Sequence, residues 1–123
     1  MGLADWYVMP QVSVPITRNR VVAPRVNRPV DEEAVANALP NARICIAEIG
    51  RLLDGHPWMA GDAISLADLL LAAHLSMLAQ TPEGAQMLGE HENLSGWLTR
   101  IEARPSMQAT TWDKLLERVA AAA

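Results

Sequence analysis

The chain has 123 residues, 50% of them hydrophobic, and a formal net charge of −4. This is enough for one domain to bury a core without metals or disulfides. The single cysteine excludes an internal disulfide. The negative charge gives no general attraction to nucleic acid or anionic lipid, and no run of about 18 apolar residues predicts a membrane span. Since the N-terminus also lacks a signal-peptide pattern, we expect one cytoplasmic domain over residues 1–123, without nucleic-acid or membrane partners.

The first segment, residues 3 to about 20, is predicted to be a bent or interrupted helix. Pro10 and Pro15 each remove a backbone donor and push the preceding residue away from helical geometry. A connection is expected over residues 18–29, and it carries the basic cluster Arg18, Arg20, Arg25 and Arg28. We interpret this cluster as a solvated loop neutralised by the acidic residues 31–33, with contact to a phosphate, or to the carboxylate of a ligand held by an adjoining domain, as alternatives. Nucleic-acid binding is disfavoured because no aromatic residues are interleaved with the arginines.

A second helix is predicted from the spacing of apolar residues, which alternates between four and three: Val35, Leu39, Ala42, Ile46, Ile49 and Leu53. Pro40 should kink it, and Asp54 and Gly55 should end it, with Gly55 in the left-handed conformation. Cys45 lies within this pattern, and we interpret it as a core residue rather than a reactive thiol.

The clearest local signal is a helix start at Ser65. Its hydroxyl is placed to accept the backbone N–H of Asp68, and the Asp68 carboxylate is placed to accept the N–H of Ser65, which together form a capping box. Ile64 and Leu69 are spaced for a hydrophobic staple. The helix that follows, over residues 66–79, is apolar almost all round, so we expect it to be central and buried.

Three shorter elements follow. Residues 81–84 predict a turn or the start of a short helix, and an amphipathic face is formed by Leu94, Trp97, Leu98 and Ile101. Ser106 is expected to cap a last helix that presents Trp112, Leu115, Leu116 and Val119. No segment has strand periodicity, so the predicted fold class is all-α.

Two of these segments resemble the C-terminal helical domain of cytosolic glutathione transferases. One is the small-residue loop and capping box over residues 58–69, and the other is the Trp97 helix with its exit Arg104-Pro105-Ser106. The resemblance implies a helical bundle of that type over the whole chain. In that family, glutathione and the group that activates it lie on a preceding thioredoxin-like domain, and no βαβ pattern of that kind occurs in these residues.

The resemblance implies that Trp6, Tyr7 and Met9 line a hydrophobic co-substrate pocket or a subunit interface; simple packing on the second helix is an equal alternative. No catalytic residue is assigned, and Asp68 is interpreted as a capping residue. No metal site is expected, because the three histidines lack partners at ligand spacing. For His74 a core position is favoured over a place in a ligand pocket.

We therefore expect a domain that shapes the co-substrate pocket for conjugation of glutathione to electrophiles when it is joined to a thioredoxin-like domain. Glutathione is then a co-substrate of the complete architecture, no cofactor is expected in this chain, and the chain alone is expected to be inactive. The alternative is a non-catalytic protein–protein interaction module of the same fold. In that architecture the first helix and part of the central helix pack on the thioredoxin-like half. A homodimer or a thioredoxin-like partner is therefore expected to cover apolar side chains there, namely Trp6, Met9, Val12 and Val14.

Overall fold

The computed structural model describes residues 2–123, and this part of the chain contains helices and no strand beyond an isolated bridge between Trp58 and Gly61. The all-α prediction is confirmed. The elements are η1 (Ala4–Val22), α1 (Ala23–Arg25), α2 (Glu32–Leu53), α3 (Leu66–Leu78), α4 (Pro82–Gly89), α5 (Glu92–Glu102), α6 (Pro105–Ala109) and α7 (Trp112–Ala122). Among the helices described, none has the length and hydropathy needed to cross a membrane.

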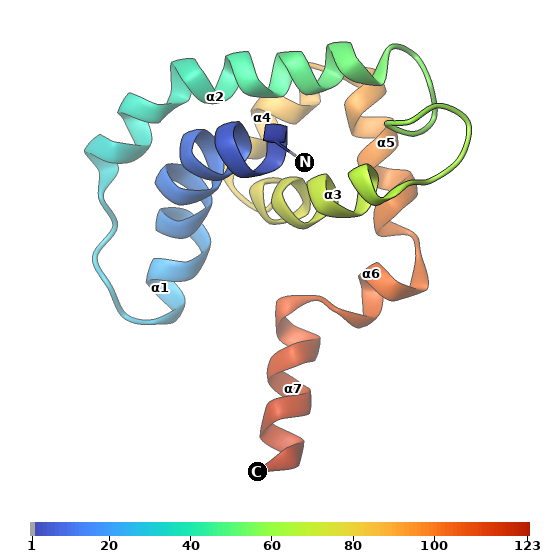
Figure 1. The fold of residues 1–123 in the computed structure, drawn as a ribbon. Helices are drawn as coiled ribbons and strands as arrows, with labels where there is room; N and C mark the ends of the chain where they lie inside the picture. Colours follow the sequence, from blue (N-terminus) through green and yellow to red (C-terminus); the bar gives the residue numbers. More distant parts are fainter. Residues whose placement is uncertain (1) are drawn as a thin grey trace.

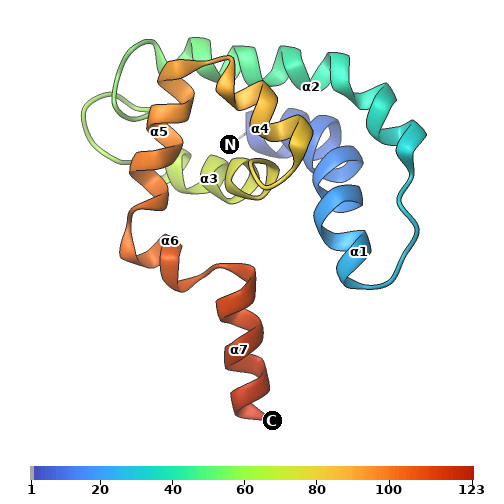
Figure 2. The ribbon, with the colours of Figure 1, turned by 180° about the vertical axis from the view of Figure 1, so that it is seen from behind.

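The long helix α2 runs along one side of the molecule, and η1 and α3 lie beside each other under it (Figure 1). Helix η1 packs mainly on α2 and α3, and α5 packs on α2, α3 and α4. The view from behind shows α4 and α5 on the face of the bundle that is turned away in Figure 1 (Figure 2). The last helix, α7, extends away from this bundle, so the core is built from η1 and α2–α5.

Helix η1 runs without interruption through Pro10 and Pro15, so the predicted interruption is wrong. It is a π-helix, in which each N–H bonds to the carbonyl five residues back, as the bond from Ala23 N–H to the Arg18 carbonyl shows at its end. This pairing gives a wider turn than the 3.6 residues of an α-helix. Its buried side chains are accordingly four to five residues apart, in the series Ala4, Val8, Val12, Ile16 and Val21.

The connection after η1 is shorter than predicted, because η1 and α1 together continue to Arg25. Helix α2 then begins at Asp31, whose side chain accepts the Ala34 N–H at 2.9 Å. It continues past the exposed Pro40 and ends at Asp54, which is itself left-handed at φ 49°, followed by Gly55 at φ 71°. The predicted end is confirmed, although a left-handed residue already occurs one position earlier than expected.

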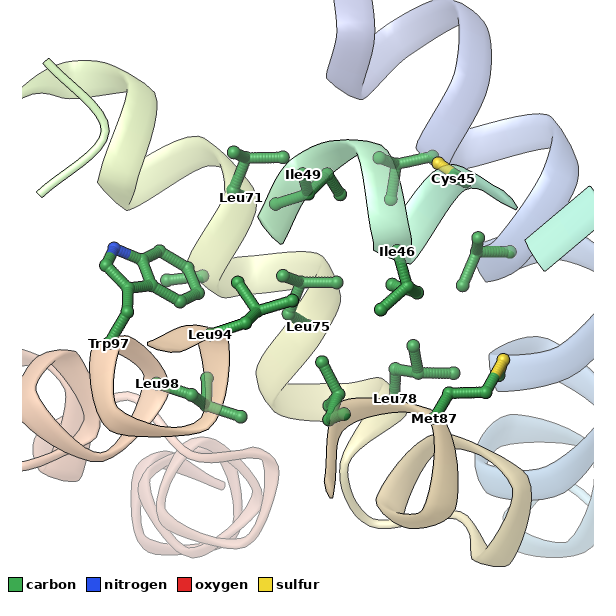
Figure 3. Packing of buried hydrophobic residues seen from close by; sticks show 14 of the residues in the cluster. Cys45, Ile46, Ile49, Leu71, Leu75, Leu78, Met87, Leu94, Trp97 and Leu98 are labelled. Carbon is green, nitrogen blue, oxygen red and sulfur yellow. The ribbon is translucent and has the colours of Figure 1, made fainter. Parts of the chain in front are cut away.

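The hydrophobic core lies between η1, α2, α3, α4 and α5, and Figure 3 labels core residues of α2 to α5. The predicted faces of α2 and α5 are buried, and Trp97 is completely inaccessible. The expected burial of α3 applies to only one of its faces. Leu75 and Leu78 are buried in the core, whereas Leu66 is 62% and Leu69 46% exposed. An apolar helix is therefore left with an uncovered side.

The last helix, α7, is capped by a different residue than expected. Ser106 lies inside the short helix α6, and α7 is instead capped by Thr111, whose side chain accepts the Lys114 N–H at 3.3 Å. All residues of α7 are exposed or half-buried, including its apolar Leu115, Leu116 and Val119. Its first turn contacts the body of the protein through Arg25, which lies over the Trp112 ring with 5.5 Å between the guanidinium carbon and the ring centroid.

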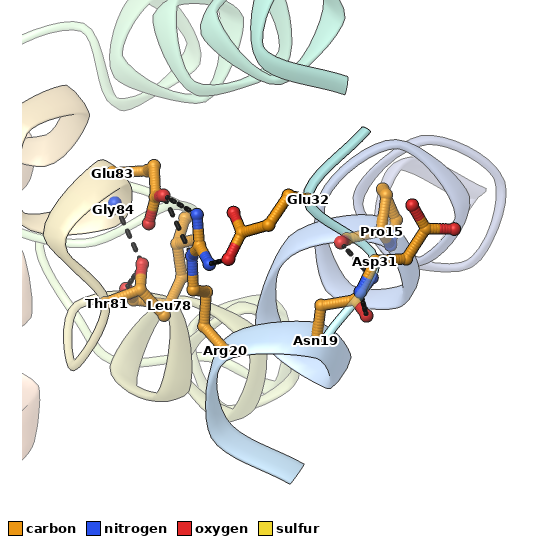
Figure 4. Close-up of polar contacts among 9 residues, drawn as sticks. All are labelled: Pro15, Asn19, Arg20, Asp31, Glu32, Leu78, Thr81, Glu83 and Gly84. Carbon is orange, nitrogen blue, oxygen red and sulfur yellow. Dashed lines mark hydrogen bonds and ion pairs between the residues drawn. The ribbon is translucent and has the colours of Figure 1, made fainter. Parts of the chain in front are cut away.

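The arginine cluster is not a uniform solvated loop. Arg20 lies on η1 and binds Glu83 of α4 at 2.6 Å and Glu32 of α2 at 2.7 Å, so it joins three helices (Figure 4). The hydrogen bond from Arg20 holds the pKa of Glu83 below its ordinary value. Next to it, Thr81 caps α4 by accepting the Gly84 N–H at 2.9 Å. These contacts fix the end of η1 against the rest of the bundle.

Candidate functional site

The capping residues hold the start of α3 in place. Ser65 is the N-cap, and the Asp68 carboxylate accepts the backbone N–H of Ser65 at 2.8 Å and the Ser65 hydroxyl at 3.0 Å. The other carboxylate oxygen accepts the Met59 N–H and the Trp97 indole N–H, each at 2.8 Å. A side chain that begins as a local cap thus also ties the preceding loop and α5 to α3.

Asp68 is fully buried, and burial alone would raise its pKa. The hydrogen bonds from Met59, Trp97 and Ser65 outweigh this effect and hold the pKa below its ordinary value. A carboxylate that is ionised, enclosed and fully hydrogen-bonded has no proton to donate to a substrate. The geometry therefore gives Asp68 a structural role.

Ile64 and Leu69, which the sequence pairs as a staple, lie in different surroundings. Ile64 packs against the core, whereas Leu69 is on the exposed side of α3. Any contact between the two would leave Leu69 largely in water, so it belongs to the uncovered apolar side of α3.

Polar side chains from η1 and α3 converge on a cavity of about 190 Å³ between the two helices. Its walls comprise Ser13, Thr17, Arg18, Val22, Ala73, His74 and Met77. The Ser13 hydroxyl and His74 Nδ1 are hydrogen-bonded across the cavity wall at 2.8 Å. Thr17 is buried, and its hydroxyl has no hydrogen-bond partner within residues 2–123. Buried polar groups are normally paired, so the unpaired hydroxyl of Thr17 is unusual in a residue that lines a cavity.

His74 is half-buried on the α3 side of this cavity. Burial lowers its pKa, and the negative charge of Asp5 partly opposes that shift. The ring is therefore mainly neutral near pH 7, with one nitrogen acting as a donor and the other as an acceptor. Its hydrogen bond to Ser13 occupies Nδ1, and Nε2 makes no bond to a described residue, so this nitrogen is free to interact with a ligand.

A larger groove of about 460 Å³ lies on the surface where η1 packs against α2. It is lined by Leu3, Tyr7, Gln11, Asn41, Ile44, Cys45 and Glu48. Burial raises the pKa of the Cys45 thiol, so the thiol stays protonated and is a poor nucleophile. This groove is open and has no orphaned polar group at its wall among those described, which favours packing with another protein surface over small-molecule chemistry.

Trp6, Tyr7 and Met9, the three residues singled out on the first helix, have different surroundings. Tyr7 lines the groove between η1 and α2, whereas Trp6 is 77% and Met9 44% exposed. Val14 is also exposed, but Val12 is fully buried in the core. The expectation that Val12 faces water is therefore wrong, because the wide turn of η1 places it on the same side as Val8.

No group of three or more residues suitable for a metal ion occurs in the described part of the chain. Of the polar residues of the small cavity, Arg18 was singled out in the basic cluster and His74 was weighed as a pocket residue, whereas Ser13 and Thr17 were missed by sequence reasoning. Ser13 and Thr17 are four residues apart on η1, a spacing that places both on one face, but the expected break at Pro15 hid this signal.

The chain matches the family model described as the C-terminal domain of glutathione S-transferase over residues 3–105. No curated protein sequence matches it.

Several solved structures share the fold. A glutathione S-transferase III in its apo form is 24% identical with a TM-score of 0.77, and the match covers 88% of this chain and 49% of that one. Glutathione transferase F7 from Populus trichocarpa is 24% identical with a TM-score of 0.74, over 86% and 49% of the two chains. A glutathione S-transferase from Sinorhizobium meliloti 1021 is 26% identical with a TM-score of 0.69, over 85% and 48%. The present chain spans about half the length of these proteins.

Proposed function

The chain belongs to the glutathione S-transferase C-terminal domain family, and on that premise we propose that it is the helical half of a glutathione transferase. In this role it shapes the co-substrate pocket, and a thioredoxin-like domain binds glutathione and activates its thiol. The reaction is then addition of the glutathione thiolate to a small electrophile. The observation that carries the proposal is the cavity between η1 and α3, where the polar residues Ser13, Thr17, Arg18 and His74 meet the apolar Val22, Ala73 and Met77.

The surface available for a second domain supports this assignment. Leu66 and Leu69 are exposed on α3, and Trp6 is exposed on the first half of η1. The starts of the two helices lie together, because residues 3–4 of the chain and Ala67, Leu70 and Leu71 of α3 line one hollow of about 220 Å³. Exposed apolar side chains around a hollow are typical of an interface.

The chemistry divides between the two halves. Burial raises the pKa of the Cys45 thiol, so this thiol is not suited to attack an electrophile. The Asp68 carboxylate is occupied by hydrogen bonds from Met59, Trp97 and Ser65. No catalytic residue is therefore assigned in this half, whose contribution is shape and positioning. Glutathione enters as co-substrate, and no cofactor is proposed. A cytoplasmic location and a homodimer formed through η1 and α2 complete the proposal.

A chimera tests the proposal. The thioredoxin-like half of the Sinorhizobium meliloti glutathione S-transferase is joined to this chain in place of its own helical half. We expect retention on immobilised glutathione and conjugation of glutathione to a chloronitrobenzene. Ala73→Trp, which fills the cavity, should abolish conjugation but not retention, whereas Ala109→Trp on α6 should change neither. A chimera that is retained on glutathione but conjugates nothing would contradict the assigned pocket.

A further inference from the structure

We propose that the cavity between η1 and α3 binds the carboxylate end of a small organic acid, so that the co-substrates of this protein are acidic electrophiles rather than purely apolar ones. The inference rests on the proposed function for the location of the pocket. The inference goes beyond the proposed function because it names the class of molecule that the pocket prefers. Its evidence is the three polar side chains Thr17, Arg18 and His74.

Arg18 supplies the positive charge. It lines the cavity, and it makes no ion pair with any described residue, in contrast to Arg20 two positions later, which is paired with two glutamates. A guanidinium presents several N–H donors in one plane and matches a carboxylate with two parallel hydrogen bonds. An unpaired arginine beside a cavity is therefore suited to an anionic group of this shape.

Thr17 supplies a donor that lacks a protein partner. Its side-chain oxygen is completely buried and makes no hydrogen bond within residues 2–123. Leaving such a group unpaired is unfavourable, and rotation of the Thr17 side chain toward the cavity that this residue lines would let a carboxylate oxygen accept its O–H. His74 Nε2 provides a third polar atom, because Nδ1 is held by Ser13 at 2.8 Å.

The charges around the cavity favour one anionic group. Arg18 is the cation on its wall, His74 is mainly neutral, and Asp5, whose charge acts on the imidazole, lies outside the lining. The remaining walls are apolar: Val22, Ala73 and Met77. With about 190 Å³, the space is smaller than the roughly 300–1,000 Å³ of drug-sized pockets, so it suits a compact acid with a short apolar body.

The test uses the intact chain and two probes of nearly equal shape, benzoate and the neutral benzamide, followed by amide resonances in solution NMR. Benzoate is expected to shift the resonances of Thr17, Ala73 and His74 and to bind about fivefold more tightly than benzamide at low salt, a difference typical of one exposed ion pair. Arg18→Gln should remove this preference and Arg18→Lys should keep part of it. Arg28→Gln is the matched control. Arg28 and Arg18 both line a separate hollow beside the loop over residues 26–31, but Arg28 does not line the cavity between η1 and α3.

Thr17→Val separates binding from stability. Because the hydroxyl has no partner in the protein, its loss should leave the urea midpoint unchanged or higher, while it lowers benzoate affinity. Unchanged benzoate affinity in Thr17→Val, or an equal loss of preference in Arg28→Gln, would overturn the proposed geometry.

The remaining outcomes distinguish this inference from the proposed function. Equal binding of benzoate and benzamide overturns the acidic preference and leaves the pocket assignment intact, whereas binding of neither probe overturns both. Glutathione, which also has carboxylates, is titrated in parallel and should leave these resonances unchanged. If glutathione shifts them and benzoate does not, the carboxylate belongs to glutathione and the co-substrate assignment is overturned.

Discussion

The indole N–H of Trp97 donates to the carboxylate of Asp68 at 2.8 Å, and both side chains are fully buried. The same oxygen of Asp68 accepts the Met59 N–H. One carboxylate thus links α5, the loop before α3 and the first turn of α3. The helix that bears His74 is held at its N-terminal end by this contact.

Loss of the Asp68 carboxylate should strongly destabilise the fold. In Asp68→Ala the Trp97 indole and the backbone N–H groups of Met59 and Ser65 lose their acceptor, and we expect a loss of about 3 kcal/mol in the free energy of unfolding. Ser65→Ala should cost about 1 kcal/mol. Urea unfolding measures both, with the exposed Asp62→Ala as control. An unchanged midpoint for Asp68→Ala would refute the structural role.

Acid should weaken the protein through the same residue. The pKa of Asp68 is lower in the folded state than its ordinary value, so its stabilising contribution is complete above the unfolded-state pKa and is lost as the pH falls through the folded-state pKa. Urea midpoints between about pH 7 and pH 3 should fall more for the native chain than for Asp68→Asn. Glu83 titrates in the same direction but is present in both proteins, so parallel curves would exclude Asp68 as a source.

Two glycines of α4 provide a matched pair. A Cβ at Gly84 would clash with the backbone carbonyl of Leu78, so Gly84→Ala should destabilise the fold by about 2 kcal/mol. At Gly89 a Cβ would meet nothing within 4 Å, and Gly89→Ala should stabilise α4 by about 0.5–1 kcal/mol. Thermal unfolding of both variants decides this, and similar shifts in the two would show that α4 does not pack on Leu78 in this way.

The features that sequence reasoning predicted are those set by neighbours along the chain. The link between Ser65 and Asp68 spans three residues, and the buried faces of α2 and α5 follow from helical spacing. The bond from Trp97 to Asp68 spans 29 residues and that from Ser13 to His74 spans 61, and no local pattern encodes either.

The errors have a common cause in η1. Prolines were expected to bend or interrupt a helix with 3.6 residues per turn, but this helix has a wider turn and continues to Val22. Its true period places Val12 in the core and Ser13 and Thr17 at the cavity. Part of α3 was expected to lie uncovered, but its sequence does not say which side, because an apolar face looks the same whether its own chain or another domain covers it.

The isolated chain should not conjugate glutathione to a chloronitrobenzene above the uncatalysed rate, and immobilised glutathione should not retain it. Cys45 remains protonated because burial raises the pKa of its thiol, and the proposed thiol-activating group belongs to a thioredoxin-like domain. Initial rates with and without the chain measure this, with Cys45→Ala as control. Saturable turnover that disappears in Tyr7→Phe or Cys45→Ala would assign catalysis to this half.

Self-association should occur through the groove between η1 and α2. Tyr7 is 59% and Ile44 68% exposed at its walls, and a two-fold pairing would cover both copies of this apolar surface with one self-complementary contact. We expect a homodimer at micromolar concentration, measured by light scattering coupled to gel filtration. Ile44→Glu places a charge in the contact and should give monomers, whereas Leu116→Glu on the projecting α7 should leave the dimer intact. A native chain that elutes as a monomer would refute self-association. A dimer that Leu116→Glu disrupts and Ile44→Glu does not would place the interface away from η1 and α2.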